Sequence, residues 1–201
     1  MTDAYDVVVV GGGVIGAATL FHLARLGCRR ALLLKRGNIA GGSTALSSGI
    51  VRTHHSVASN VAVARASLRM FEGFAELLDD PEADAGLVRS GYLIVAPPNG
   101  ASAAARRSVA MQQGMGIECG LLDRAEALAR HPWLHLDDID AIGFEAEAGF
   151  ADPYLVATGF ARAARRLGAE IRIGIAVTGL LRNEDQITDH GRRCPKRRIF
   201  I

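Results

Sequence analysis

The hydrophobic positions at the start of the chain follow a strand, helix, strand order. Residues 7–10 are an unbroken run of valines, which is typical of a parallel strand buried on both faces. Glycines follow in G-x-G-x-x-G spacing, and apolar residues then recur at helical spacing up to Gly27. A second apolar run covers residues 32–34. The pattern predicts a βαβ unit completed within about 30 residues.

Beyond this unit the pattern predicts further helices and strands. Apolar residues three and four positions apart predict one helix over residues 57–79, ended by Asp79-Asp80-Pro81. The helix that follows an Asp152 N-cap is expected to turn Leu155, Phe160, Ala164 and Leu167 inward and to close on Gly168. The other expected elements are strands at 87–96, 117–122, 141–147 and 170–177, a helix at 101–115, and a helix opened by a capping box at Asp123 and Glu126. Residues after Leu181 show no periodicity, and 192–198 contain five basic residues. The fold class is therefore α/β, or α+β when the whole chain is considered.

The glycine spacing indicates a dinucleotide site because it lies between a predicted strand and a predicted helix. Gly11 would make the tight turn, Gly13 would let the backbone approach a pyrophosphate, and Gly16 would let the helix pack closely on the strand. With Val14 and Ile15 beginning the helix, the phosphates would lie on its unpaired N–H groups. The alternative is a βαβ unit that binds no ligand.

Lys35 and Arg36 end the second strand, where dinucleotide folds usually place an acidic side chain against the adenosine ribose. A basic pair at this position is able to bind a 2′-phosphate, as in NADP sites, and the alternative is two solvated charges. Residues 37–56 are rich in glycine and hydroxyl side chains, which suits a segment that lies along a phosphate-bearing ligand. Its candidate contacts are Ser43, Thr44, Ser47, Ser48 and Gly49.

Composition narrows the function further. Hydrophobic residues make up 49% of the 201 residues and charged residues 22%, which is enough for a substantial core. Aromatic residues at 5% and a formal charge of +2 argue against a nucleic-acid partner. The cysteines, three in number and far apart, predict a reducing compartment and no metal site. Acidic residues precede the first apolar run, so it does not resemble a signal peptide or membrane span, and we expect a cytoplasmic protein.

The order of these motifs resembles the FAD-dependent D-amino-acid oxidase superfamily, and within it the sarcosine oxidase, dimethylglycine dehydrogenase and glycine oxidase branch. The residues that carry the resemblance are YDVVVVGGGVIG, ALLLKRG, GGSTALSSGIVRTHHS, LVRSGYLIVA and GFADPYLVATGFARAARRLGAEI, which span residues 5 to about 181. The resemblance implies FAD as cofactor, bound by the glycine turn and by the segment from Ser43 to Gly49. It also implies a contact between the adenine and a backbone group of Val177.

The resemblance also implies a reaction. In this family a hydride equivalent moves from the carbon beside an amine to the flavin, and the imine then hydrolyses. Arg52 and His54 or His55 fall where related enzymes place basic residues beside the flavin ring, so they are the candidate catalytic residues. The alternative for His54 and His55 is ordinary loop histidines. The expected substrate is a small amine or amino acid.

Two departures from the family keep other interpretations open. The family usually has glutamate in place of Lys35, and its chains are much longer than 201 residues. We therefore expect a Rossmann-like FAD domain over residues 1–80 and 150–181, the start of an antiparallel substrate-domain sheet over 81–149, and an irregular basic tail over 182–201, as in a truncated enzyme. The alternatives are an NADP-binding protein, or a non-catalytic fragment or subunit of a flavoenzyme that requires a second subunit.

Overall fold

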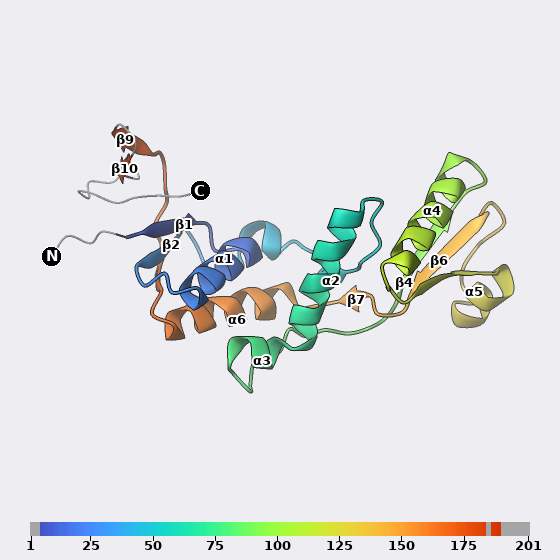
Figure 1. Cartoon of the computed structure of the whole chain (residues 1–201), viewed down its shortest axis with the longest axis horizontal. Coiled ribbons are helices and arrows are strands. Elements are labelled where there is room, and N and C mark those ends of the chain that lie inside the picture. The colour runs from blue at the N-terminus through green and yellow to red at the C-terminus, as the bar shows by residue number, and fades with distance from the viewer. Residues whose placement is uncertain (1–4, 184–185, 190–201) are drawn as a thin grey trace. The chain divides into compact units, whose positions relative to one another are not determined.

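The computed structural model describes residues 5–183 and 186–189, which form a mixture of helices with parallel and antiparallel strands (Figure 1). The predicted fold class is confirmed. The chain divides into two compact units: unit 1 takes its described residues from Met1–Ser48, Phe74–Gly86 and Asp152–Ile201, and unit 2 from Gly49–Gly73 and Leu87–Ala151. This division reflects compactness and not function, so the assignment of segments to cofactor and substrate stays a prediction.

Unit 1 contains the predicted βαβ unit. Strands β1 (Val7–Val10), β2 (Ala31–Lys35) and β8 (Glu170–Ile173) form a parallel sheet in the order β1-β2-β8, with Val8 beside Leu32 and Leu33 beside Ile171. Leu32, Leu33 and Leu34 are buried because β2 is the central strand. The expectation that β1 is buried on both faces is wrong at Val10, which is 44% exposed because it lies at the end of the strand, where it lines an open pocket.

Two helices lie side by side on this unit (Figure 1). They are α1 (Val14–Arg25) and α6 (Pro153–Arg166), and the rings of Phe21 and Phe160 meet between them with centroids 5.4 Å apart. The Asp152 carboxylate accepts hydrogen bonds from the Tyr154 and Leu155 N–H groups, which confirms the predicted N-cap. Burying two aromatic side chains at this contact contributes about 1.5–3 kcal/mol each.

The inward face of α6 differs from the expected one. Leu155 is 39% and Leu167 48% exposed, whereas Val156, Phe160 and Ala164 are buried. The ends of a helix extend past the element it packs on, so spacing alone misplaces the terminal residues. Near its centre, a side chain at Gly159 would lie 2.8 Å from the Phe74 ring of α3 (Phe74–Leu78).

The predicted helix over 57–79 is two helices. α2 (Ala58–Glu72) ends at Gly73, and α3 follows it at once in the other unit. Gly73 is the C-cap of α2, and its N–H still donates to the Arg69 carbonyl oxygen. A glycine is the residue that most readily leaves helical geometry, because it has no Cβ. The apolar stripe continued through this break and concealed it.

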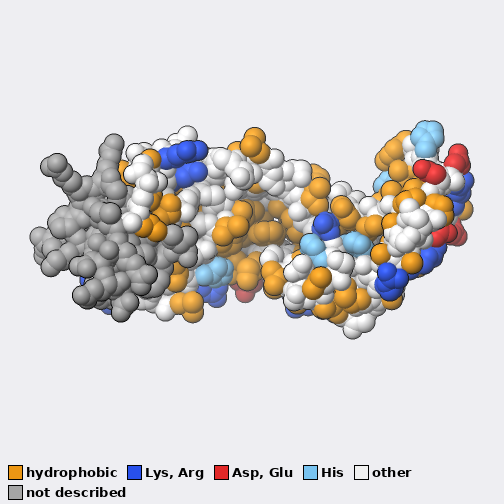
Figure 2. All heavy atoms as spheres, turned by 90° about the horizontal axis from the view of Figure 1, so that it is seen from above, with side chains coloured by type: hydrophobic (Ala, Val, Ile, Leu, Met, Phe, Trp, Pro, Cys, Tyr) orange, Lys and Arg blue, Asp and Glu red, His pale blue; other side chains and the backbone are white. Residues whose placement is uncertain are grey.

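Unit 2 is built on an antiparallel sheet with β6 (Ala141–Glu145) between β4 (Tyr92–Ala96) and β5 (Cys119–Leu122). Helices α4 (Gly100–Gly114) and α5 (Arg124–Arg130) pack on it, and α5 has the predicted capping box. A short pair, β3 (Ile50–Val51) and β7 (Gly149–Phe150), completes the unit. Figure 2 shows acidic and basic side chains intermixed at the end that carries α4 and α5, where ion pairs join Arg106 to Asp140 and Arg124 to Asp137.

Four predicted strands are shorter in the structure, and one of them, expected at 117–122, is β5 and begins at Cys119. β4 begins at Tyr92, not at 87, because Gly91 has a φ of +76° that a strand does not accommodate. β8 ends at Ile173 because Gly174 has a φ of +75°. The predicted 141–147 strand ends at Glu145.

The end of the chain differs from the irregular tail expected over 182–201. β9 (Leu181–Asn183) pairs antiparallel with β10 (Gln186–Asp189). A hairpin of two short strands leaves little hydrophobic periodicity in the sequence, which is why the pattern did not predict it. The basic run at 192–198 lies outside the described residues.

Two observations concern the environment of the protein. In the described part of the chain, no helix is both long and apolar enough to cross a membrane. Cys28 and Cys119 carry free thiols, and Cys194 lies outside the described residues. The compartment stays a prediction.

Candidate functional site: a nucleotide pocket in unit 1 and a basic segment in unit 2

The glycine turn joins β1 to α1 with close backbone contacts. Gly11 has a φ of +110°, which L-residues rarely adopt, and its N–H donates to the Leu34 carbonyl oxygen at 2.9 Å. A Cβ atom on Gly16 would lie 2.0 Å from the Gly11 carbonyl oxygen. Gly16 therefore allows the first turn of α1 to lie against the chain that leaves β1, in line with the packing role predicted for it.

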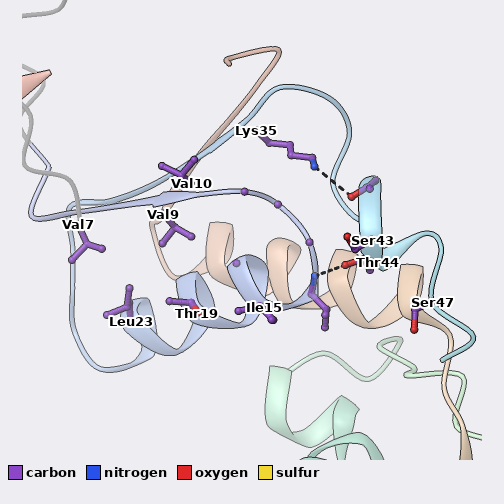
Figure 3. A pocket seen from close by; sticks show the side chains of 17 residues that line it. Val7, Val9, Val10, Ile15, Thr19, Leu23, Lys35, Ser43, Thr44 and Ser47 are labelled. Atoms are coloured by element: carbon purple, nitrogen blue, oxygen red, sulfur yellow. Dashed lines mark hydrogen bonds between the residues drawn. The ribbon is translucent and has the colours of Figure 1, made fainter. Parts of the chain in front are cut away.

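Thr44 lies against the start of α1. It ends η1, a 3₁₀ helix over Gly42–Thr44, and its side chain is buried. Its Oγ1 atom accepts a hydrogen bond from the Val14 N–H at 3.0 Å (Figure 3). A Cβ atom on Gly13 would lie 2.7 Å from that Oγ1. A side chain at position 13 would therefore displace the Thr44 hydroxyl group, so the folded chain itself favours glycine here, in addition to any role toward a ligand.

Lys35 extends from the end of β2 toward the same region. Its Nζ atom donates to the Gly41 carbonyl oxygen at 3.4 Å, and Figure 3 shows the side chain directed at the segment that precedes Thr44. The cation therefore stands at the end of the strand where a carboxylate would contact a ribose in many dinucleotide sites. Arg36 is exposed and does not line the pocket described next.

These elements surround a cavity of about 1020 Å³, which is large enough for a nucleotide. Of the residues predicted to bind a cofactor, nine line it: Gly11, Gly13, Val14, Ile15, Gly16, Lys35, Ser43, Thr44 and Ser47. Arg36, Ser48, Gly49 and Val177 are not among its lining residues. Val177 packs on the cluster formed by Val8, Leu32 and Leu34, and Gly49 accepts a backbone hydrogen bond from Ala151.

The pocket residues suit a diphosphate. The glycines leave the backbone open to a close approach, and the N-terminus of α1 carries the positive end of its dipole. The first turn of α1 contains no acidic residue that would repel an anion. Gly12, which the G-x-G-x-x-G spacing does not specify, is also constrained, since a Cβ atom at this position would lie 2.7 Å from Ile39 Cδ1.

The candidate catalytic residues lie in unit 2, directly after β3. The Arg52 guanidinium donates to the His54 carbonyl oxygen and lies over the Tyr92 ring, 5.3 Å from its centroid. The His54 ring is within hydrogen-bond distance of the Gln112 side chain, and the His55 carbonyl oxygen accepts from Gln112 Nε2 at 3.2 Å. Burial lowers the pKa of His54, and the contact with Gln112 offsets part of that shift.

Sequence reasoning missed the two buried polar residues that hold this segment. Glu145 of β6 and Gln112 of α4 are both fully buried. The signal available for Glu145 was an acidic residue at the end of the otherwise apolar run AIGFE. No local pattern links either residue to the segment near Arg52, because 92 positions separate Glu145 from Thr53 and 58 separate Gln112 from His54.

The fold and the glycine turn define a nucleotide-binding βαβ protein. A family model described as FAD dependent oxidoreductase (DAO) matches residues 6–200, so the chain belongs to this family. The predicted family is confirmed, and the match extends past residue 181, where the resemblance was expected to end. The cofactor of the family is FAD, and the comparisons give no support to the NADP-binding alternative.

Similarity to individual proteins supports this family assignment. The chain is 33% identical over 172 residues to FAD-dependent oxidoreductase domain-containing protein 1 of Bos taurus, covering 81% of this chain and 35% of that protein. It is 29% identical to sarcosine oxidase subunit beta of an Arthrobacter species, covering 92% and 46%. The solved structure of glycine oxidase from Geobacillus kaustophilus is similar with a TM-score of 0.77 and 26% identity, covering 92% and 50%. The chain thus spans between a third and a half of the length of these relatives.

Proposed function

We propose that this chain provides the FAD-binding part of an oxidoreductase that oxidises the C–N bond of a small amine or amino acid. The observation that carries the proposal is the pocket at the start of α1, where nine of the predicted cofactor contacts come together. The names of the relatives support the substrate class, since they include sarcosine oxidase and glycine oxidase. FAD, when bound, supplies the hydride acceptor.

The residues of this chain would bind the cofactor and orient it. Gly11, Gly13 and Gly16 would admit the diphosphate to the α1 N-terminus, where N–H groups and the helix dipole stabilise its charge. Lys35 would stand beside the ribose as a hydrogen-bond donor, where relatives of the predicted type have an acceptor. Ser43, Thr44 and Ser47 line the same pocket and would contribute hydroxyl groups.

Arg52 would bind the carboxylate of an amino-acid substrate. A guanidinium has five N–H donors, so the bond to the His54 carbonyl oxygen leaves donors for a ligand. The Tyr92 ring beneath it holds the guanidinium plane by a cation–π contact. The lowered pKa of His54 favours its neutral form near pH 7, so Arg52 would supply the positive charge of this segment toward a substrate carboxylate.

The proposal is tested by purifying the full chain and recording its visible absorption spectrum, before and after adding FAD. A flavin spectrum that stays with the protein through gel filtration is the expected result, followed by turnover in a screen of sarcosine, glycine, proline and D-amino acids. A folded protein that stays colourless with FAD would refute the proposal. If FAD binds without turnover, co-purification with a second subunit that restores turnover would support the subunit alternative. The absence of any such partner would support the alternative of a non-catalytic fragment.

A further inference from the structure

Glu145 is a fully buried carboxylate that none of the roles above uses. It lies at the end of β6 with no exposed surface. Its Oε1 atom accepts hydrogen bonds from the Thr53 N–H at 2.8 Å and from the Thr53 hydroxyl at 2.7 Å. Its Oε2 atom accepts from the His54 N–H at 3.0 Å. One side chain therefore holds two successive peptide groups of the basic segment.

Burying the Glu145 carboxylate costs free energy unless both of its oxygens accept hydrogen bonds. A buried carboxylate loses its hydration, and this loss is compensated only when donors face its oxygens. An ionised carboxylate is an acceptor only, and all three contacts of Glu145 come from donors. An apolar side chain would fill the same space without this cost, so packing alone does not account for a carboxylate at this position.

Residues 53–55 lie outside the described helices and strands, and side chains bind their backbone groups in place of a sheet partner. Glu145 binds the N–H groups of Thr53 and His54, Arg52 binds the His54 carbonyl oxygen, and Gln112 binds the His55 carbonyl oxygen. Buried backbone groups need such partners. Consecutive peptide planes with fixed partners have one conformation, which sets the direction of the side chains they carry.

We propose that Glu145 is a positioning residue that fixes the backbone of Thr53 and His54, and so orients Arg52 and His54 for the substrate. Gln112 assists by holding the His54 ring and the next carbonyl group. The inference that this orientation serves a substrate rests on the proposed function. The positioning itself does not, because it concerns contacts within unit 2.

The first test needs no cofactor. In Glu145→Gln an NH₂ group replaces one oxygen and faces a donor, so at least one N–H of the segment loses its acceptor. Amide hydrogen exchange at Thr53 and His54 should become tenfold faster or more, whereas exchange at Val8 and Leu33 in the other unit should not change. Glu118→Gln, which removes an exposed carboxylate from the same unit, is the matched control. Unchanged exchange at Thr53 and His54 would overturn the proposal.

The His54 ring provides a second measurement that separates positioning from simple charge. Titration by NMR should show that the pKa of His54 rises in Glu145→Gln, because a released ring becomes hydrated and burial is the main cause of its lowered pKa. If Glu145 acted only as a nearby negative charge, its removal would lower the pKa of His54 further, and that result would contradict the proposal. Should Glu145→Gln not fold, Thr53→Val removes one donor to the carboxylate, and faster exchange at His54 is again expected.

Turnover measured with the flavin-loaded chain links the positioning to the reaction. With any amino-acid substrate that the wild-type chain oxidises, Glu145→Gln should raise KM about tenfold while its flavin content equals that of Glu118→Gln. An unchanged KM would overturn the role toward substrate. If the wild-type chain binds no FAD, the proposed function fails, and the exchange and titration results still decide whether Glu145 positions the segment.

Discussion

Thr44 caps the helix that begins at Val14. The Thr44 hydroxyl oxygen accepts the Val14 N–H at 3.0 Å, although 30 positions separate the two residues. Gly13, the N-cap by position, has no side chain to do this. The bond ties the hydroxyl-rich segment after β2 to the glycine turn after β1, and these are the two parts of the predicted cofactor site. One contact therefore maintains both the helix start and the shape of the pocket.

Replacing Thr44 by valine keeps the volume and removes this acceptor. Because the Val14 N–H is left without its partner, Thr44→Val should lower the free energy of unfolding by about 0.5–2 kcal/mol. The measurement is urea denaturation, read as a lower midpoint at an unchanged m-value. Ser43→Ala, which removes an exposed hydroxyl one residue away, serves as the stability control. Equal midpoints for the two variants would show that the cap contributes nothing.

Gly16→Ala tests the close approach of α1 to the glycine turn. A methyl group placed 2.0 Å from the Gly11 carbonyl oxygen forces the backbone apart. We expect a loss of about 1–3 kcal/mol or more in unfolding free energy, together with loss of FAD binding. Gly120→Ala is the control, because its Cβ atom would meet nothing within 4 Å. Wild-type stability and FAD affinity in Gly16→Ala would be inconsistent with this geometry.

Lys35→Glu should strengthen FAD binding. A carboxylate at the end of β2 is able to accept hydrogen bonds from the ribose hydroxyls, which an ammonium group is unable to do. One hydrogen bond to a charged group contributes about 1.5–3 kcal/mol, so we expect Kd to fall about tenfold or more. Titration of flavin fluorescence measures the change, with Arg36→Glu as a control outside the pocket. Weaker binding in Lys35→Glu would contradict this prediction, and would mean that the donor contact of the Lys35 ammonium group contributes more to FAD binding than the acceptor contacts of a carboxylate.

Arg52→Ala should raise KM for amino-acid substrates about tenfold or more, because a charge-assisted bond to the carboxylate is lost. The effect should be absent for an amine without a carboxylate. Arg107→Ala removes an exposed cation from α4 in the same unit and is the matched control. Steady-state kinetics with an amino acid and with an amine that lacks the carboxylate measure this difference. If Arg52 acted only on the fold, KM would rise equally for both substrates.

The lowered pKa of His54 predicts a pH dependence of stability. Below the ordinary histidine pKa of 6.5, His54 takes up a proton in the unfolded chain, whereas the partly buried imidazole of the folded chain resists protonation. The stability that neutral His54 contributes to the folded chain is therefore complete above pH 6.5. It is lost as the pH falls from 6.5 through the pKa of His54 in the folded state. His22, whose pKa burial and Arg25 also lower, acts in the same direction.

His54→Gln should accordingly lose less stability than the wild-type chain between pH 7.5 and 5.5. Urea denaturation at several pH values measures the difference, and His135→Gln controls for the loss of an exposed imidazole. Parallel curves for wild type and His54→Gln would contradict the predicted burial.

The sequence by itself determined the features that depend on neighbouring residues. The valine run and the glycine spacing predicted β1, the turn and α1, since backbone sterics and side-chain periodicity act over a few positions. The Asp152 N-cap and the capping box of α5 are equally local, and the structure contains both. The resemblance to the family was carried by the glycine turn and by the segment around Asp152, together with other local motifs.

Only the tertiary structure decided what depends on contacts between distant segments. The break between α2 and α3 at Gly73 and the outward positions of Leu155 and Leu167 depend on what each helix packs against. The hydrogen bonds from Val14 to Thr44 and from Thr53 to Glu145 form only because the fold brings these distant segments together. A local pattern records which residue types occur and at what spacing, whereas a hydrogen bond across 92 positions depends on the whole path of the chain between them.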